Sequence, residues 1–85
     1  MEIRVPKLAL YLLSTEGCHL CENAKQILDN MQQQYQYVDI IEQEQLVQTY
    51  GEHIPVIIAE SAEQALFWPF NEQQIEQYKE HYGIS

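Results

Sequence analysis

The sequence predicts an α/β fold with a central four-stranded mixed sheet flanked by helices. Three patterns indicate this class: a buried strand leads through a tight turn into a helix, a second strand follows that helix, and a hairpin pattern precedes the last helix. The expected order of elements is β-α-β-α-β-β-α. Because 85 residues fall below the roughly 100 to 200 residues of an ordinary domain, we expect residues 1–85 to form one domain.

The first strand and the first helix are predicted on either side of a short polar turn. Residues Lys7–Leu13, KLALYLL, form an apolar run between Pro6 and the Ser14–Gly17 turn, which is typical of a strand buried on both faces. A helix is then predicted from near Cys18 to about Gln33. Its expected inward face carries apolar residues at helical spacing: Leu20, Ala24, Ile27, Leu28 and Met31.

A second strand and a short second helix follow. Residues Tyr35–Ile41, YQYVDII, are rich in β-branched and aromatic side chains, which favour a strand. Since a helix connects this strand to the first, the two are expected to lie parallel, as a right-handed βαβ unit. The acidic segment Glu42–Tyr50 is predicted to be a helix that stops at Gly51. Its expected inward side chains are Leu46, Val47 and Tyr50.

A hairpin and a capped helix complete the expected fold. The apolar runs Val56–Ala59 and Ala65–Trp68 are separated by a polar segment, the pattern of two antiparallel strands. Asn71 is predicted to cap the last helix in a capping box with Gln74, and Gly83 is the expected stop. The expected buried stripe of this helix is Ile75, Tyr78 and Tyr82.

The composition is strongly acidic. Thirteen Asp and Glu residues against four Lys and Arg give a formal net charge of −9, which repels nucleic acid and anionic membranes alike. The charge is consistent with simple solubility or with a preference for basic protein partners. The apolar run Leu8–Leu13 is too short for a secretory signal or a membrane span, so a cytoplasmic location is expected.

Cys18 and Cys21 are the only cysteines, and their Cys-x-x-Cys spacing at the start of a helix is typical of a redox pair. The reactive species is a thiolate, and the N-terminus of a helix favours that charged form by lowering the pKa of the thiol. Gly17 allows the tight turn needed to place Cys18 there. One turn later, Cys21 lies within reach, so Cys18 is expected to attack and be exposed, and Cys21 to resolve and be more buried.

The charges beside the pair oppose one another. A protonated His19 would favour the thiolate of Cys18, as would Lys25, whereas Glu16 and Glu22 would disfavour it. Two other interpretations stay open: half of a metal site, and two inert cysteines. A closed zinc site needs four ligands, and this motif supplies two with no histidine at ligand spacing, so we expect no resident metal.

The motifs resemble those of a known family. The segment GCHLC opening a helix after a buried strand, IPV before the third strand, and the order of elements resemble the glutaredoxin branch of the thioredoxin-fold proteins. The segments GCHLCENA and WPF are most similar to those of small bacterial glutaredoxin-like proteins, many of which lack an assigned substrate. This resemblance implies a thioredoxin-like fold across the whole chain. We expect the protein to be monomeric and to hold no bound cofactor.

The resemblance also implies roles for individual residues. Cys18 corresponds to the attacking cysteine, Cys21 to the resolving cysteine, and Pro55 to a cis-proline that faces them. The backbone groups of Ile54 would then be free to pair with an extended peptide or with glutathione as an added strand. Ile54, Pro55 and His19 are therefore the expected substrate-binding residues.

Two features depart from the family pattern. Glutathione-using members usually carry a basic residue just before the first cysteine and a glycine pair after the fourth strand, whereas this chain has Glu16–Gly17 and FWPFNE there. Trp68, Pro69 and Phe70 are interpreted as core packing at a strand end, with an apolar wall that contacts a partner beside the site as the alternative. Four tyrosines are likewise interpreted as packing residues: Tyr11, Tyr35, Tyr37 and Tyr50.

The leading functional hypothesis is a thiol–disulfide oxidoreductase that reduces protein disulfides, with glutathione as a candidate co-substrate or mixed-disulfide partner. One alternative is a redox-sensing or adaptor module in which oxidation of the cysteines changes binding without turnover. Another is a metal or iron–sulfur carrier in which a second chain or glutathione completes the ligand set.

Overall fold

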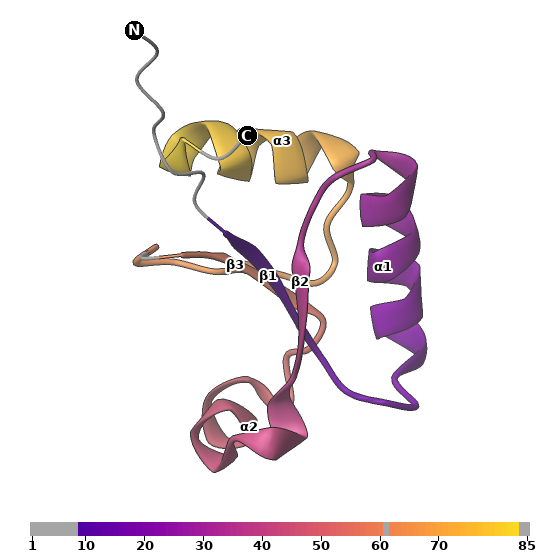
Figure 1. Cartoon of the computed structure of the whole chain (residues 1–85), viewed down its shortest axis with the longest axis vertical. Helices are drawn as coiled ribbons and strands as arrows, with labels where there is room; N and C mark the ends of the chain where they lie inside the picture. Colours follow the sequence, from indigo (N-terminus) through magenta and orange to yellow (C-terminus); the bar gives the residue numbers. More distant parts are fainter. Residues whose placement is uncertain (1–8, 61, 84–85) are drawn as a thin grey trace, which may run out of the picture.

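A computed structural model describes residues 9–60 and 62–83 of the chain (Figure 1). The elements appear in the predicted order, with one added turn of 3₁₀ helix, η1, after the second strand. Their bounds are β1 Leu10–Ser14, α1 His19–Asn30, β2 Gln36–Asp39, η1 Ile40–Glu42, α2 Glu44–Tyr50, β3 Val56–Ala59, β4 Leu66–Phe67 and α3 Glu72–Tyr82. Residues Lys7 and Leu8, expected in the first strand, lie outside the described residues.

The four strands form one mixed sheet in the order β2-β1-β3-β4. The β1 and β2 strands are parallel, as expected for strands joined by a helix, while β3 is antiparallel to both β1 and β4. The predicted fold class is therefore confirmed.

Each face of the sheet contributes to a separate apolar cluster, because side chains alternate along a strand. On one face, Leu12 of β1 and Ile57 of β3 pack with Leu28 of α1 and Ile75 of α3. On the other face, the buried cluster is Leu13, Ile40 and Val56, against which Leu46 and Tyr50 of α2 are partly buried. The sheet thus lies between α1 and α3 on one side and η1 and α2 on the other.

The register brings several loops to one edge of the sheet, which is the edge where β1, β2 and β4 end and β3 begins. Ser14, at the end of β1, lies opposite Asp39, at the end of β2, while Leu13 lies opposite Val56, the first residue of β3. Val56 in turn lies opposite Phe67, the last residue of β4. The loop that leads to Cys18, the segment before β3 and the segment after β4 therefore all emerge at this edge.

The α1 helix begins beside Cys18 as predicted, but its end and the exposure of one side chain differ from the prediction. The helix ends at Asn30, about three residues early, and Gln32 in the following turn adopts a left-handed conformation with φ of 55°. Leu20, expected on the inward face, is 44% exposed. The buried face is centred on Cys21, Ala24 and Leu28, so Leu20 falls at its margin in the first turn.

Two further side chains that were expected to pack inward are exposed. Tyr37 is 48% exposed because β2 is an edge strand with a neighbouring strand on one side only. Val47 is exposed because the short α2 turns Leu46 and Tyr50 toward the sheet in its place. The second strand is also shorter than expected, since the Asp39 carboxylate accepts a hydrogen bond from the Ile41 backbone N–H and starts η1.

The last helix matches its prediction closely. Asn71 and Gln74 form the capping box, with each side chain accepting the other residue's backbone N–H at 2.9 Å. Gly83 ends the helix in the left-handed region, with φ of 68°. Ile75 is fully buried, and Tyr78 and Tyr82 are partly buried against the same cluster.

Candidate functional site

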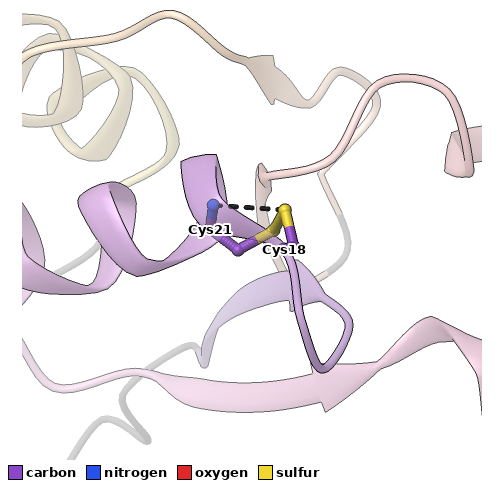
Figure 2. The surroundings of a disulfide bond; sticks show 2 residues. All are labelled: Cys18 and Cys21. Atoms are coloured by element: carbon purple, nitrogen blue, oxygen red, sulfur yellow. Dashed lines mark hydrogen bonds between the residues drawn. A yellow bond between two sulfur atoms is a disulfide. The ribbon is translucent and has the colours of Figure 1, made fainter.

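The two cysteines lie together at the start of α1 and are joined by a disulfide bond, with 5.2 Å between their Cα atoms (Figure 2). They are three positions apart in the sequence, which places Cys21 about one helical turn after Cys18. The pair is therefore close enough to cycle between the disulfide and the dithiol without a large change of the backbone.

Cys18 is the N-cap residue of α1. Its backbone is extended, with φ of −84° and ψ of 110°, and its Sγ accepts a hydrogen bond from the Cys21 backbone N–H at 3.2 Å. Figure 2 shows this contact as a dashed line. An N-cap atom normally carries the oxygen of Ser, Thr, Asp or Asn, so the sulfur here takes the place of a hydrogen-bond acceptor. The position favours negative charge on Cys18 Sγ once the disulfide is opened.

The turn before the helix fixes Cys18 in this position. The Cys18 backbone N–H donates to the Thr15 carbonyl at 3.3 Å, and its own carbonyl accepts from the Glu22 N–H at 3.3 Å. Gly17 adopts a φ of +83°, which is the left-handed region that side chains disfavour. Sequence reasoning identified Gly17 but had no signal for the Thr15 contact, since any residue offers a carbonyl.

The two sulfur-bearing residues differ in exposure. Cys18 is partly buried, whereas Cys21 is only 3% exposed. Of the two residues, Cys18 is therefore the more accessible from the surface.

Ile54 and Pro55 lie at the same edge of the sheet, directly before β3. The peptide bond between them is cis, Pro55 is buried and Ile54 is partly buried. The expectation that both backbone groups of Ile54 are free is wrong in one respect. The Ile54 N–H donates to the Tyr50 carbonyl at 3.1 Å, because the chain makes a helical turn after α2 before it enters β3.

His19, the third expected substrate-binding residue, is the first residue of α1 and is exposed. It adjoins Cys18 in the chain, so it stands at the same surface. The structure thus brings Cys18, Cys21 and His19 into one helical turn and places Ile54 and Pro55 at the same sheet edge; their roles toward a substrate stay predictions.

The aromatic segment after β4 belongs to the core. Phe70 is buried, and Trp68 packs edge-on against it with 5.0 Å between ring centroids. Both contribute to the cluster under α1 and α3, as the core-packing interpretation holds, whereas Pro69 between them is exposed. The Trp68–Pro69 bond is a second cis peptide bond that the sequence analysis did not predict.

Two features are absent from the part of the chain that the structure describes. Within residues 9–60 and 62–83, no three His, Cys, Asp or Glu side chains gather closely enough to hold a metal ion. In the same residues no helix combines the length and the apolar character needed to cross a membrane.

Comparison with known proteins assigns the chain to a family. A family model described as Glutaredoxin-like domain (DUF836) matches residues 9–78, which include both cysteines and most of α3. The chain belongs to this glutaredoxin-like family. Family and cysteine pair together support a thiol redox role. No curated protein matches the chain significantly.

Two solved structures share the fold of this glutaredoxin-like protein. The X-ray structure of protein XcR50 from X. campestris is 27% identical, with a TM-score of 0.74 over 86% of this chain and 97% of that chain. The solution NMR structure of protein Ne2328 from Nitrosomonas europaea is 25% identical, with a TM-score of 0.71 over 92% and 98%. Neither description states a substrate, so the two structures support the fold, and the reaction must be inferred from the geometry of the site.

Proposed function

We propose that this glutaredoxin-like protein is a thiol–disulfide oxidoreductase that reduces disulfides of protein clients. The observation that carries the proposal is the asymmetry of the pair: Cys18 caps a helix and is accessible, while Cys21 is buried one turn behind it. The helix N-terminus stabilises a thiolate on Cys18, and burial protects Cys21 from direct reaction with the client.

The reaction starts from the reduced dithiol. The Cys18 thiolate attacks one sulfur of the client disulfide, the client S–S bond breaks, and its other sulfur leaves as a thiolate that takes up a proton. The chain and the client are then joined by a mixed disulfide. Cys21 loses its proton and attacks Cys18 Sγ, which releases the second client sulfur as a thiolate. Two electrons pass to the client, and an external thiol or dithiol must reduce the Cys18–Cys21 disulfide before the next cycle.

The client is proposed to lie along the edge of the sheet beside Pro55. We assign the Ile54 carbonyl as the backbone group that accepts a hydrogen bond from an extended client segment, since the Ile54 N–H already donates to Tyr50. His19, exposed beside Cys18, is assigned to contact the client on the helix side of the disulfide. Glutathione is a candidate reductant or mixed-disulfide partner. We further propose that the protein is cytoplasmic and monomeric.

A single-turnover experiment tests the reaction. The chain is reduced, freed of reductant and mixed with a peptide disulfide, and the products are trapped with a thiol-alkylating reagent and identified by mass spectrometry. Wild type should yield reduced peptide and an oxidised Cys18–Cys21 pair. Cys21→Ser should accumulate the mixed disulfide on Cys18, and Cys18→Ser should lose at least 100-fold in rate, because a buried Cys21 cannot meet the peptide.

The variants are compared with Ser14→Ala, a buried serine beside the turn that leaves both sulfurs in place. Equal rates for Cys18→Ser and Cys21→Ser would contradict the assigned order of attack. A wild-type rate no higher than that of Cys18→Ser would contradict the enzyme itself and favour a redox-sensing module, while stoichiometric metal in the purified protein would favour a carrier.

A further inference from the structure

Two carboxylates flank the cysteine pair. Glu16 lies in the turn that precedes Cys18, and Glu22 lies in the first turn of α1, where its backbone N–H is 3.3 Å from the Cys18 carbonyl oxygen. Both side chains are exposed. Two exposed carboxylates thus lie within four residues of Cys18, and neither is paired with a lysine or arginine in the described residues.

A second group of acidic residues lies at the same edge of the sheet. Asp39 ends β2 directly opposite Ser14 of β1, so the chain that follows it begins beside the turn that carries Cys18. That following chain, through η1 and α2 to Ile54, adds three exposed carboxylates: Glu42, Glu44 and Glu52. This segment packs on the opposite face of the sheet from α1, which carries Glu22.

Positive charge is sparse around the site. The lysines among residues 9–60 and 62–83 are Lys25 and Lys79. Lys25 follows Cys18 by seven residues, about two helical turns or roughly 10 Å along the axis. Lys79 is in α3, pairs with Glu76 at 3.5 Å, and belongs to the helix at the top of Figure 1, whereas the turn before α1 is at the bottom.

We propose that Glu16 and Glu22, supported by the acidic segment after β2, make the site selective for disulfides flanked by lysine or arginine residues of a protein client, and disfavour anionic disulfides, including those of glutathione. This inference rests on the proposed thiol–disulfide exchange and names its substrate class. Fields of one sign around a site raise the encounter rate of oppositely charged partners by about 10 to 10³, and salt removes the effect. Glutathione disulfide carries a net negative charge near pH 7, so the same field slows its approach.

The test uses three peptide disulfides that differ only in the residues beside cysteine: three lysines, three serines or three glutamates. Each carries a fluorophore and a quencher that separate when the disulfide is reduced. The reduced chain is mixed with each peptide under single-turnover conditions at 20 mM and at 500 mM NaCl. Every rate is divided by that of the same peptide with dithiothreitol, because flanking lysines make a disulfide intrinsically more reactive toward any thiol.

The normalised lysine-to-glutamate rate ratio is expected to be at least about tenfold at low salt and to fall toward one at high salt, where the screening length shrinks to a few ångströms. Glu16→Gln/Glu22→Gln should reduce the low-salt ratio by at least about threefold. The matched control is Glu63→Gln/Glu80→Gln, which removes the same charge from two exposed residues, one in the β3–β4 connection at the opposite edge of the sheet and one in α3. It should leave most of the ratio intact.

Three results would overturn the proposal. A ratio near one at low salt, with the serine peptide still reduced faster than by Cys18→Ser, would overturn the selectivity and leave the exchange reaction standing. An equal loss of ratio in both double variants would assign the effect to net charge and not to Glu16 and Glu22. Reduction of no peptide above the Cys18→Ser rate would overturn the proposed function together with its selectivity.

Discussion

At the scale of single residues, two identical side chains one helical turn apart can lie in unlike environments. Cys18 presents a sulfur as the cap of a helix, and Cys21, one turn later, is buried by the same helix. Away from the site, Tyr78 and Tyr82 are also about one turn apart, and there both hydroxyls form hydrogen bonds with the backbone of Gln64. The Tyr78 hydroxyl accepts the Ala59 N–H at 2.9 Å and donates to the Gln64 carbonyl at 2.7 Å, so one phenol joins α3 to both ends of the β3–β4 connection.

Tyr78→Phe tests this contact. Removing the hydroxyl leaves the buried Ala59 N–H without its acceptor, so the free energy of unfolding should fall by about 1–3 kcal/mol. The matched control, Tyr37→Phe, removes a hydroxyl from an exposed ring and should change it by less than about 0.5 kcal/mol. Urea unfolding followed by circular dichroism measures both, and an equal loss in the two variants would contradict the assigned role of the phenol.

The same tyrosine gives a pH dependence with a defined sign. Burial raises the pKa of Tyr78 above its usual value of 10.0, although the Ala59 N–H bond opposes this shift. The folded state thus favours the neutral phenol, so the contribution is complete below pH 10 and is lost as pH rises through the folded pKa. Between pH 10 and 12 the stability of wild type should therefore fall more steeply than that of Tyr78→Phe.

At the scale of elements, helix ends and strand edges separate what the sequence predicts from what it does not. The capping box of Asn71 and Gln74 and the stop at Gly83 depend on neighbours within a few residues, so the sequence predicted α3 almost to the residue. The exposure of Leu20, in the first turn of α1, and of Tyr37, in the edge strand β2, depends on which other elements pack against those positions. Local periodicity contains no information on that packing, and both residues were predicted incorrectly.

A pair of leucines in α1 tests the observed orientation of the helix. Leu28 is fully buried in the cluster between the sheet, α1 and α3, so Leu28→Ala should reduce the free energy of unfolding by about 2–5 kcal/mol. Leu20→Ala, the same substitution two turns earlier, should reduce it by about 0.5 kcal/mol or less. Urea midpoints of the two variants measure the difference. Similar losses would show that Leu20 is buried as the helical spacing first suggested.

At the scale of the whole molecule, the site is a product of topology. The pairing of Cys18 with Cys21 could be predicted because their spacing lies within one turn, and the structure joins the two by a disulfide bond. The proximity of Asp39 to the turn before Cys18 requires the parallel register of β1 and β2, and the hydrogen bond from the Ile54 N–H to Tyr50 requires the turn after α2. Contacts between distant segments of this kind follow from pairing and packing, which no local sequence pattern specifies.

The net charge of −9 gives the last prediction at this scale. The ion pair found in the described residues is Lys79–Glu76, so most carboxylates repel one another across the surface and the repulsion weakens the compact state. Raising NaCl from 20 to 300 mM should therefore increase the urea midpoint, with most of the gain below about 150 mM, where the screening length reaches about 8 Å. Glu63→Gln/Glu80→Gln, with a charge of −7 from −9 + 2, should start from a higher midpoint and gain less. A midpoint that rises linearly with salt and equally in both proteins would instead indicate exclusion of salt from the protein surface and would contradict charge repulsion as the cause.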